Sequence, residues 1–188
     1  MKKVNIPSQL RKAGVPRSCW AINCDDTGRG YINTWAEDVY KRFDSRESRL
    51  GVYVRPVGRE SSMLAIEAVE LHARQAVVHG VPGKYLTFSR LVQLLRLSET
   101  REASDEDIHS LVGRGFFAIP VLPTVVSWPG GQQHAYNEAM GFLHSHICEG
   151  GILLTSAAHK LLTEYKGGVG FPLELEKLIF DTSVIVEV

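Results

Sequence analysis

Apolar residues in this chain follow two different spacings, which predict alternating strands and helices. In five short segments they succeed one another without polar alternation, as in strands buried on both faces of a sheet. Between these segments they recur at i, i+3 and i+4, the spacing of helices with one buried face. The predicted strands are residues 50–54, 84–88, 115–128, 151–155 and 182–188. The predicted helices are residues 31–48, 61–79, a segment after Ser89, 105–112, 132–147, 157–165 and 172–179.

Glycines, prolines and small polar residues mark where these elements end. Gly80, Pro82 and Gly83 end the helix 61–79, and Ser89 is a candidate N-cap of the helix that follows it. Residues 1–30 are polar and broken by prolines and glycines, so we expect an N-terminal arm with little regular structure. The expected buried face of the helix 31–48 carries Trp35, Val39, Tyr40 and Phe43.

The order of the elements predicts a single α/β domain over residues 31–188. Strands that alternate with helices and are apolar throughout indicate a central, mainly parallel five-stranded sheet in a three-layer α/β/α arrangement. Pro120 and Pro123 interrupt the segment 115–128, which is otherwise apolar like a central strand. In such sheets, ligands bind at the carboxyl ends of the strands. The loop between the first strand and the helix 61–79 lies at such an end.

Charge and hydropathy narrow the choice of partners. The formal net charge is zero and the pI is about 7.1, so no global attraction to nucleic acid or to an anionic membrane is expected. No apolar run approaches the roughly 20 residues of a membrane helix. The N-terminus has two lysines with no apolar core behind them, unlike a signal peptide. We therefore expect a cytoplasmic protein with no membrane partner.

Three cysteines are present. A disulfide framework uses a larger and even number of cysteines, so none is expected. Cys19 and Cys24 loosely match a metal-ligand spacing, and His144, His146 and Cys148 alternate. Alternating residues share a face on a strand but not on a helix. Because the segment is predicted to be helical, we expect buried thiols and surface histidines rather than a metal site.

The order and spacing of the elements resemble the AAA+ domain of bacterial helicase loaders of the DnaC type and the related IstB ATPases. Residues 10–16 (LRKAGVP) are similar to the stretch that opens many of these proteins. Residues 50–65 resemble the first strand and Walker A loop, and residues 85–96 the second strand and its helix. Residues 150–161 are similar to the sensor-1 strand, and the C-terminal LEKLIFDTSVIVEV to the last helix and strand. The resemblance implies a P-loop NTPase-like (AAA+, RecA-like) domain.

The departures from the family pattern lie at the residues that perform its chemistry. A P-loop uses glycines that free backbone N–H groups, a lysine for the terminal phosphates and a Ser or Thr for magnesium. On that pattern Arg55 and Glu60 stand at the two glycine positions and Ser61 at the lysine position. Ser62 alone matches, with Gly58 inside the loop. The carboxylate of Glu60 would repel a phosphate at the helix N-terminus.

The other catalytic positions of the family are lost as well. No acidic residue lies between Gly115 and Gly131, where the Walker B acids should hold magnesium. Ala157 replaces the sensor-1 asparagine, and Lys177 stands where a family arginine often lies. The resemblance therefore implies a pseudo-ATPase with no catalytic residues, in which binding of ATP or Mg²⁺ as a cofactor is not expected.

Two interpretations stand for each remaining polar group. The loop Gly58, Arg59, Glu60, Ser61 and Ser62 is either a weak anion site at a helix N-terminus or a helix cap made by a serine. Thr155 and Ser156, in the sensor-1-like position, either line the former nucleotide site or cap the end of a strand.

Basic and aromatic residues outside the loop are candidate contacts to DNA or a partner, or are ordinary solvated and core residues. The basic candidates are Lys2, Lys3, Arg11, Lys12 and Arg17 near the N-terminus and Arg90, Arg96 and Arg101 near the second strand. The aromatic candidates, which could stack on bases, are Trp20, Trp35 and Trp128.

Three functions fit this sequence. The first is an inactive replication accessory that binds a replicative helicase, an AAA+ partner or single-stranded DNA. The second is a structural or regulatory subunit that uses the ATPase fold as a scaffold in a homo- or hetero-oligomer. The third is an active ATPase with an unfamiliar loop.

Overall fold

The computed structural model describes residues 5–24, 29–42, 50–57, 61–99, 108–123, 131–157 and 173–188. Its centre is a five-stranded sheet in the order β2-β3-β4-β1-β5, in which every neighbouring pair is parallel. The predicted five-stranded parallel sheet is therefore confirmed. The strands are β1 (Gly51–Arg55), β2 (Gly83–Tyr85), β3 (Phe116–Leu122), β4 (Ile152–Ala157) and β5 (Ser183–Glu187).

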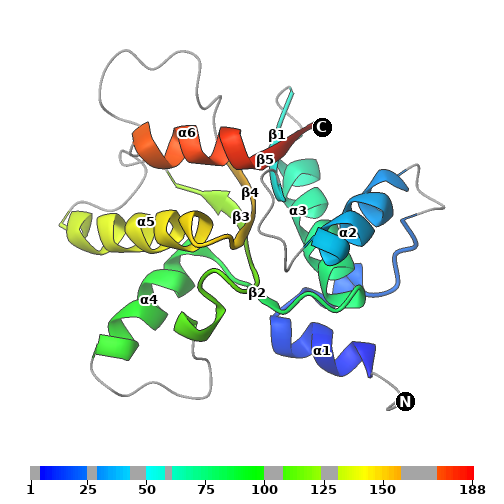
Figure 1. The fold of residues 1–188 in the computed structure, drawn as a ribbon, viewed down its shortest axis with the longest axis horizontal. Helices are drawn as coiled ribbons and strands as arrows, with labels where there is room; N and C mark the ends of the chain where they lie inside the picture. The colour runs from blue at the N-terminus through cyan, green and yellow to red at the C-terminus, as the bar shows by residue number, and fades with distance from the viewer. Residues whose placement is uncertain are drawn as a thin grey trace.

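Helices lie against both faces of this sheet (Figure 1). On one side are α1 (Ile6–Ala13), α2 (Tyr31–Arg42) and α3 (Ser61–Val78), and on the other α4 (Phe88–Glu99), α5 (Gln133–Cys148) and α6 (Leu173–Thr182). Two short 3₁₀ helices, η1 (Arg17–Cys19) and η2 (His109–Leu111), lie in the connections. This arrangement is the α/β class that the alternating pattern predicts, and it is compatible with three layers.

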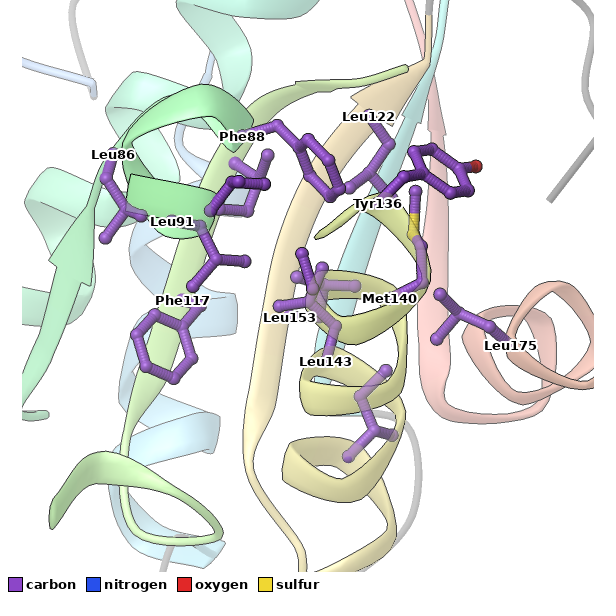
Figure 2. Packing of buried hydrophobic residues seen from close by; sticks show 14 of the residues in the cluster. Leu86, Phe88, Leu91, Phe117, Leu122, Tyr136, Met140, Leu143, Leu153 and Leu175 are labelled. Atoms are coloured by element: carbon purple, nitrogen blue, oxygen red, sulfur yellow. The ribbon is translucent and has the colours of Figure 1, made fainter. Parts of the chain in front are cut away.

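Each face of the sheet has its own hydrophobic core, as the continuous apolar strands require. Alternate residues of a strand point to opposite faces. Phe117 of β3 and Leu153 of β4 therefore pack under α4 and α5 (Figure 2), while Phe116 and Ile152 pack under α3. Figure 2 also shows Tyr136, Met140 and Leu143 of α5 and Leu175 of α6 facing the first of these cores.

Residues 6–19 contain two short helices and pack against the rest of the fold, which the sequence did not predict. Pro7 stands in the first turn of α1, and the side chain of Asn5 accepts a hydrogen bond from the N–H of Ser8 at its start. Leu10 is 2% exposed and joins the core beneath α3. The expectation of little regular structure before residue 30 is therefore wrong for residues 6–19. The expectation failed because an eight-residue helix with few apolar positions depends on tertiary burial for its stability, which the local sequence does not show.

Glu70 of α3 holds this N-terminal segment in place. The thiol of Cys19 donates to Glu70 Oε2 at 3.1 Å, and the hydroxyl of Tyr85 in β2 donates to Glu70 Oε1 at 3.0 Å. Gly14 ends α1 with φ +78°, and a Cβ at this position would lie 2.6 Å from the carbonyl oxygen of Tyr85. Only glycine suits both the backbone angle and this close approach to β2.

Several predicted element ends differ from the structure. The helix 61–79 is confirmed as α3, and 132–147 as α5. The predicted strand 84–88 is shorter, because α4 already begins at Phe88. The expected cap is also displaced: Thr87 Oγ1, not Ser89, accepts the N–H of Arg90 at 3.2 Å.

Three further expectations are only partly met. In α2 the buried residues are Ile32, Ala36 and Val39, whereas Tyr40 is 59% exposed. Only η2 is helical among the described residues of the predicted helix 105–112. The strand 115–128 is observed as Phe116–Leu122, with Pro120 inside it.

The predicted helix 157–165 begins within β4, and its remainder lies outside the described residues. No helix in the part of the chain that the structure describes has both the length and the apolarity to cross a membrane.

Candidate functional site

The topology of the sheet singles out one place for a ligand, at the carboxyl ends of β1 and β4. These strands are neighbours, and the next described helices after them lie on opposite faces of the sheet. The next described helix after β1 is α3, and the next after β4 is α6, on the other side of the sheet (Figure 1). A crevice at such a switch point is where open parallel sheets bind their ligands. The loop that the sequence singled out leaves β1 at this point.

Beyond β1 the chain continues alongside β5. The N–H of Val188 donates to the carbonyl of Arg55 at 3.1 Å, and the N–H of Val57 donates to the carbonyl of Val188 at 2.7 Å. The Arg55 guanidinium pairs with the carboxylate of Glu187. Residues 55–57 therefore follow the edge strand, and the N–H of Val57 already has an acceptor. The pairing with Glu187, near the C-terminus, was not identified from the sequence, because it depends on β5 lying beside β1.

The predicted phosphate-loop residues are only partly described. Gly58, Arg59 and Glu60 lie outside the described residues. Ser61 is the first residue of α3 and is 5% exposed, and Ser62 beside it is exposed. Both serines therefore occupy the first turn of α3. The choice between an anion site and a helix cap stays a prediction.

Thr155 and Ser156 lie near the carboxyl end of β4, which pairs with β1. Ser156 is paired in register with Val54 of β1 and is 2% exposed. Thr155 is fully buried, and its hydroxyl lies 2.7 Å from the carbonyl oxygen of Ile119 in β3, to which it donates. The Thr155 hydroxyl therefore joins two strands rather than facing a ligand.

The reason for this hydrogen bond is the proline in β3. Pro120 has no N–H, and the register between β3 and β4 shifts between Ile119 and Leu122. A buried carbonyl left without a donor at such an irregularity would be costly, and the Thr155 hydroxyl supplies the donor. Neither of the two roles predicted for Thr155 includes this one.

The carboxyl end of β3, where Walker B acids would stand, is apolar. Ile119 and Leu122 are fully buried, and Pro123 follows. Through Pro123, the last described residue here, no carboxylate accompanies this strand end. The acidic residue of β5 at this edge is Glu187, and its carboxylate is paired with Arg55.

A buried phenol lies beneath the same edge. Tyr53 of β1 is 1% exposed, its ring lies 6.0 Å from that of Phe180 in α6, and its hydroxyl has no hydrogen-bond partner among the described residues. Burial raises the pKa of Tyr53 to about 12, so the phenol is neutral at physiological pH. The sequence gives no signal for a functional role of this residue, because a tyrosine inside an apolar strand has the pattern of a core residue.

The structure does not gather the predicted basic residues into one path. Arg11 and Lys12 lie on α1, whereas Arg90 and Arg96 lie on α4 across the sheet. Arg90 donates to Gln93 at 2.7 Å, and the Arg17 guanidinium lies 5.8 Å from the ring centroid of Trp20. Lys2, Lys3 and Arg101 lie outside the described residues.

The two described tryptophans make contacts within the fold. The Trp20 Nε1–H donates to the carbonyl of Val15 at 2.9 Å. Trp35 packs against the core beside α3, with its ring centroid 5.0 Å from that of His72. Trp128 lies outside the described residues.

The sulfur and imidazole groups do not converge on one point. Cys19 and Cys24 are both buried, and Cys19 bonds Glu70. In α5, His146 is buried, and its ring nitrogens contact the Gly113 N–H at 3.3 Å and the Ile152 carbonyl at 3.2 Å. Burial lowers the pKa of His146 to about 4. No cluster of three or more metal-ligating side chains exists within the described ranges.

Comparison with known proteins adds no identity: no protein-family model matches the chain, and no curated protein matches it significantly.

Proposed function

We propose that this protein is a catalytically inactive relative of the DnaC and IstB helicase loaders. It acts as a DNA-replication accessory by binding a replicative helicase, an AAA+ partner or single-stranded DNA. The proposal joins two supports: the order of elements that resembles this family, and the chemistry of the carboxyl edge of the sheet. Since a fold alone does not determine function, the second support carries more weight.

The observation that carries the proposal is the hydrogen-bonded ladder between residues 55–57 and the C-terminal strand. A phosphate-binding loop must present free backbone N–H groups to the phosphate immediately after this strand. Here the Val57 N–H is bonded to Val188, and Arg55, at the first glycine position, is paired with Glu187. Among the described residues of this edge, no lysine and no free carboxylate lies beside Thr155. These features favour binding of a protein or a nucleic acid over hydrolysis of ATP.

Exposed apolar side chains beside this edge favour a protein as partner. Val57 is 62% exposed, and Met63 and Leu64 in the first turn of α3 are 81% and 46% exposed. Large apolar side chains that gather on a surface are typical of interaction sites, and methionine adapts to differently shaped partners. The edge that binds nucleotide in an active relative would thus contact a partner protein here.

The alternative function, a scaffold subunit in an oligomer, draws on the same surface. The exposed Val184 and Ile185 of the edge strand β5 would extend it toward a second copy of this chain. The two functions differ in the partner: a scaffold assembles with itself, whereas an accessory protein requires the helicase or DNA.

A calorimetric titration with ATP, with and without Mg²⁺, tests the loss of catalysis. We expect no binding at micromolar concentrations. Micromolar binding would overturn the inactive assignment and favour the third function, an active ATPase with an unfamiliar loop. As a matched control, the variant Glu60→Gly with Ser61→Lys restores two motif positions. It should regain little hydrolysis, because no acid accompanies the described end of β3.

A pull-down with a replicative helicase and a gel shift on single-stranded DNA across a salt series test the accessory role. We expect at least one of them to bind at physiological salt. If neither binds while sedimentation shows a stable homo-oligomer, the accessory role is overturned and the scaffold function replaces it.

A further inference from the structure

A cavity lies on the amino-terminal side of the sheet, away from the candidate site. It has a volume of about 740 Å³ and lies at the amino end of β2, among α1, the turn after α3 and η2. Gly83, which begins β2, lines it, whereas the candidate site lies at the carboxyl ends of β1 and β4. In Figure 1, α1 lies at the bottom of the molecule with β2 above it, and both lie away from α6 and the C-terminus. The two sites are therefore distinct.

Cations from two elements meet at this cavity. Arg11 and Lys12 come from the last turn of α1, and Lys84 comes from β2. The Lys84 ammonium donates to the carbonyl of Lys12 at 3.0 Å, so residues far apart in the chain are held together. None of the described residues that line the cavity is acidic.

Helix dipoles do not cancel this positive charge. α1 and α3 both end at the cavity, and each helix C-terminus is equivalent to about half a negative charge. Together they contribute roughly one negative charge, against two positive charges from Arg11 and Lys12 alone. The positive charges of Arg11 and Lys12 are stabilising at the C-terminus of α1, because the helix dipole is negative there. A surplus of positive charge nevertheless remains to attract an anion.

The rest of the lining suits the uncharged part of a ligand. Val77, Val81, Pro82 and Leu111 present aliphatic surface, and Gln9 presents an amide. A ligand with a phosphate for the cations and a flat, partly apolar body for the aliphatic wall matches this division. The volume falls within the range of about 300–1,000 Å³ typical of small-molecule sites. A nucleotide has both parts.

We infer that this cavity, which we call the α1–β2 groove, binds a nucleotide unit. Its phosphate contacts Arg11, Lys12 and Lys84, and its base packs against the aliphatic wall. The unit comes either from a free mononucleotide or from a single strand of nucleic acid. The inclusion of a nucleic-acid strand rests on the proposed function. The exposure of Arg11 and Lys12 at the rim allows a strand to continue beyond the groove.

The test compares the full-length protein with a variant that removes two rim cations, Arg11→Ala with Lys12→Ala. Its matched control, Lys41→Ala with Lys177→Ala, removes two exposed cations on α2 and α6. Thymidine monophosphate is titrated by calorimetry, and a dye-labelled oligothymidylate is titrated by fluorescence anisotropy across a salt series. Lys84→Ala, measured separately, probes the cation from β2.

We expect the groove variant to weaken binding about tenfold or more, while the control binds like the wild type. For the oligothymidylate, the slope of log K against log salt concentration should fall by roughly 0.7 for each cation removed. Binding of the mononucleotide identifies a free nucleotide as the ligand. Binding of the oligothymidylate alone identifies a strand.

The inference is overturned if neither probe binds at low salt, or if the groove variant and the control lose affinity equally. These results are distinguishable from failure of the proposed function. If the protein captures the helicase but binds neither probe, only the inference about the groove is overturned. A protein whose groove variant loses thymidine monophosphate, but which captures no helicase and binds no oligothymidylate, loses only the replication role.

Discussion

The hydroxyl of Thr155 in β4 donates a hydrogen bond of 2.7 Å to the carbonyl of Ile119 in β3, the residue before Pro120. This bond lies in the centre of the sheet, where the proline interrupts the ladder between the two strands. Thr155→Val keeps the shape but leaves a buried carbonyl without its donor, which should cost about 1–3 kcal/mol in the free energy of unfolding. Urea denaturation measures this.

Thr155→Ser is the control, because it retains the hydroxyl and loses only a methyl group. It should cost about 1 kcal/mol. Equal losses for the two variants would contradict a role of the hydroxyl in the sheet.

Gly151 lies directly against the ring of His146. A Cβ at this position would come within 2.2 Å of the imidazole, which is buried and bonded on both sides. Gly151→Ala should therefore destabilise the protein by about 1–3 kcal/mol through overpacking. Thermal unfolding followed by circular dichroism measures the change.

Gly141 offers a matched control in the preceding helix. It lies on the exposed side of α5, and no atom lies within 4 Å of the place that a Cβ would occupy. Gly141→Ala should instead stabilise the protein by about 0.5–1 kcal/mol, since alanine favours a helix interior over glycine. A loss at both positions would contradict the packing described for Gly151.

Two buried histidines should make the stability depend on pH. Burial lowers the pKa of both His72 and His146 to about 4, from 6.5. The unfolded chain therefore binds protons first as the pH falls. The stabilising effect of the neutral rings is complete above pH 6.5 and is lost between about 6.5 and 4. By about pH 5, each histidine should have lowered the free energy of unfolding by about 2 kcal/mol.

Urea denaturation at several pH values measures this dependence. His72→Leu and His146→Leu should each flatten it, whereas His134→Gln, which changes an exposed histidine on α5, should not. A profile unchanged by both buried substitutions would show that other groups cause the acid sensitivity.

The cysteines should differ in reactivity. Burial and the hydrogen bond to Glu70 raise the pKa of Cys19 to about 12, and Cys24 is also buried, whereas Cys148 is exposed. A disulfide reagent at about pH 8 should react quickly with Cys148 and with the others only on unfolding, because the thiolate is the nucleophile. Cys148→Ser should remove the fast phase, and a fast phase that persists would contradict the burial of Cys19 and Cys24.

The exposed apolar residues at the start of α3 should contribute to partner binding. Met63→Ser with Leu64→Ser should change the stability by no more than about 0.5 kcal/mol each, and should reduce helicase capture in the pull-down. Tyr40→Ser is the control, because Tyr40 is 59% exposed but lies on α2, near Gly80 at the other end of α3. Equal capture by all three proteins would exclude this surface as the partner site.

The sequence predicted the elements better than their ends and contacts. Helices α3 and α5 were predictable because long amphipathic patterns carry their own signal. The start of α4 was missed, since the choice of Thr87 over Ser89 as cap depends on where β2 stops pairing with β3. Helix α1 was missed because its stability comes from burial of Leu10 beneath α3.

The candidate site shows the same division. The sequence pattern alone placed Thr155 and Ser156 at the end of a strand, and the structure places them near the end of β4 beside β1. The pairing of Arg55 with Glu187 and the bond from Thr155 to Ile119 did not follow, because both cross between strands that are distant in the chain.

The pattern of residues is enough to specify the class of this protein: continuous apolar strands alternating with amphipathic helices must form a parallel sheet covered on both faces, since only then are the strands buried. The assembled fold establishes which strands are neighbours, which histidines are buried, and that Lys84 lies against Lys12 in the α1–β2 groove. These properties depend on the path of the chain between elements, because contacts between distant residues form only when the whole sheet is assembled.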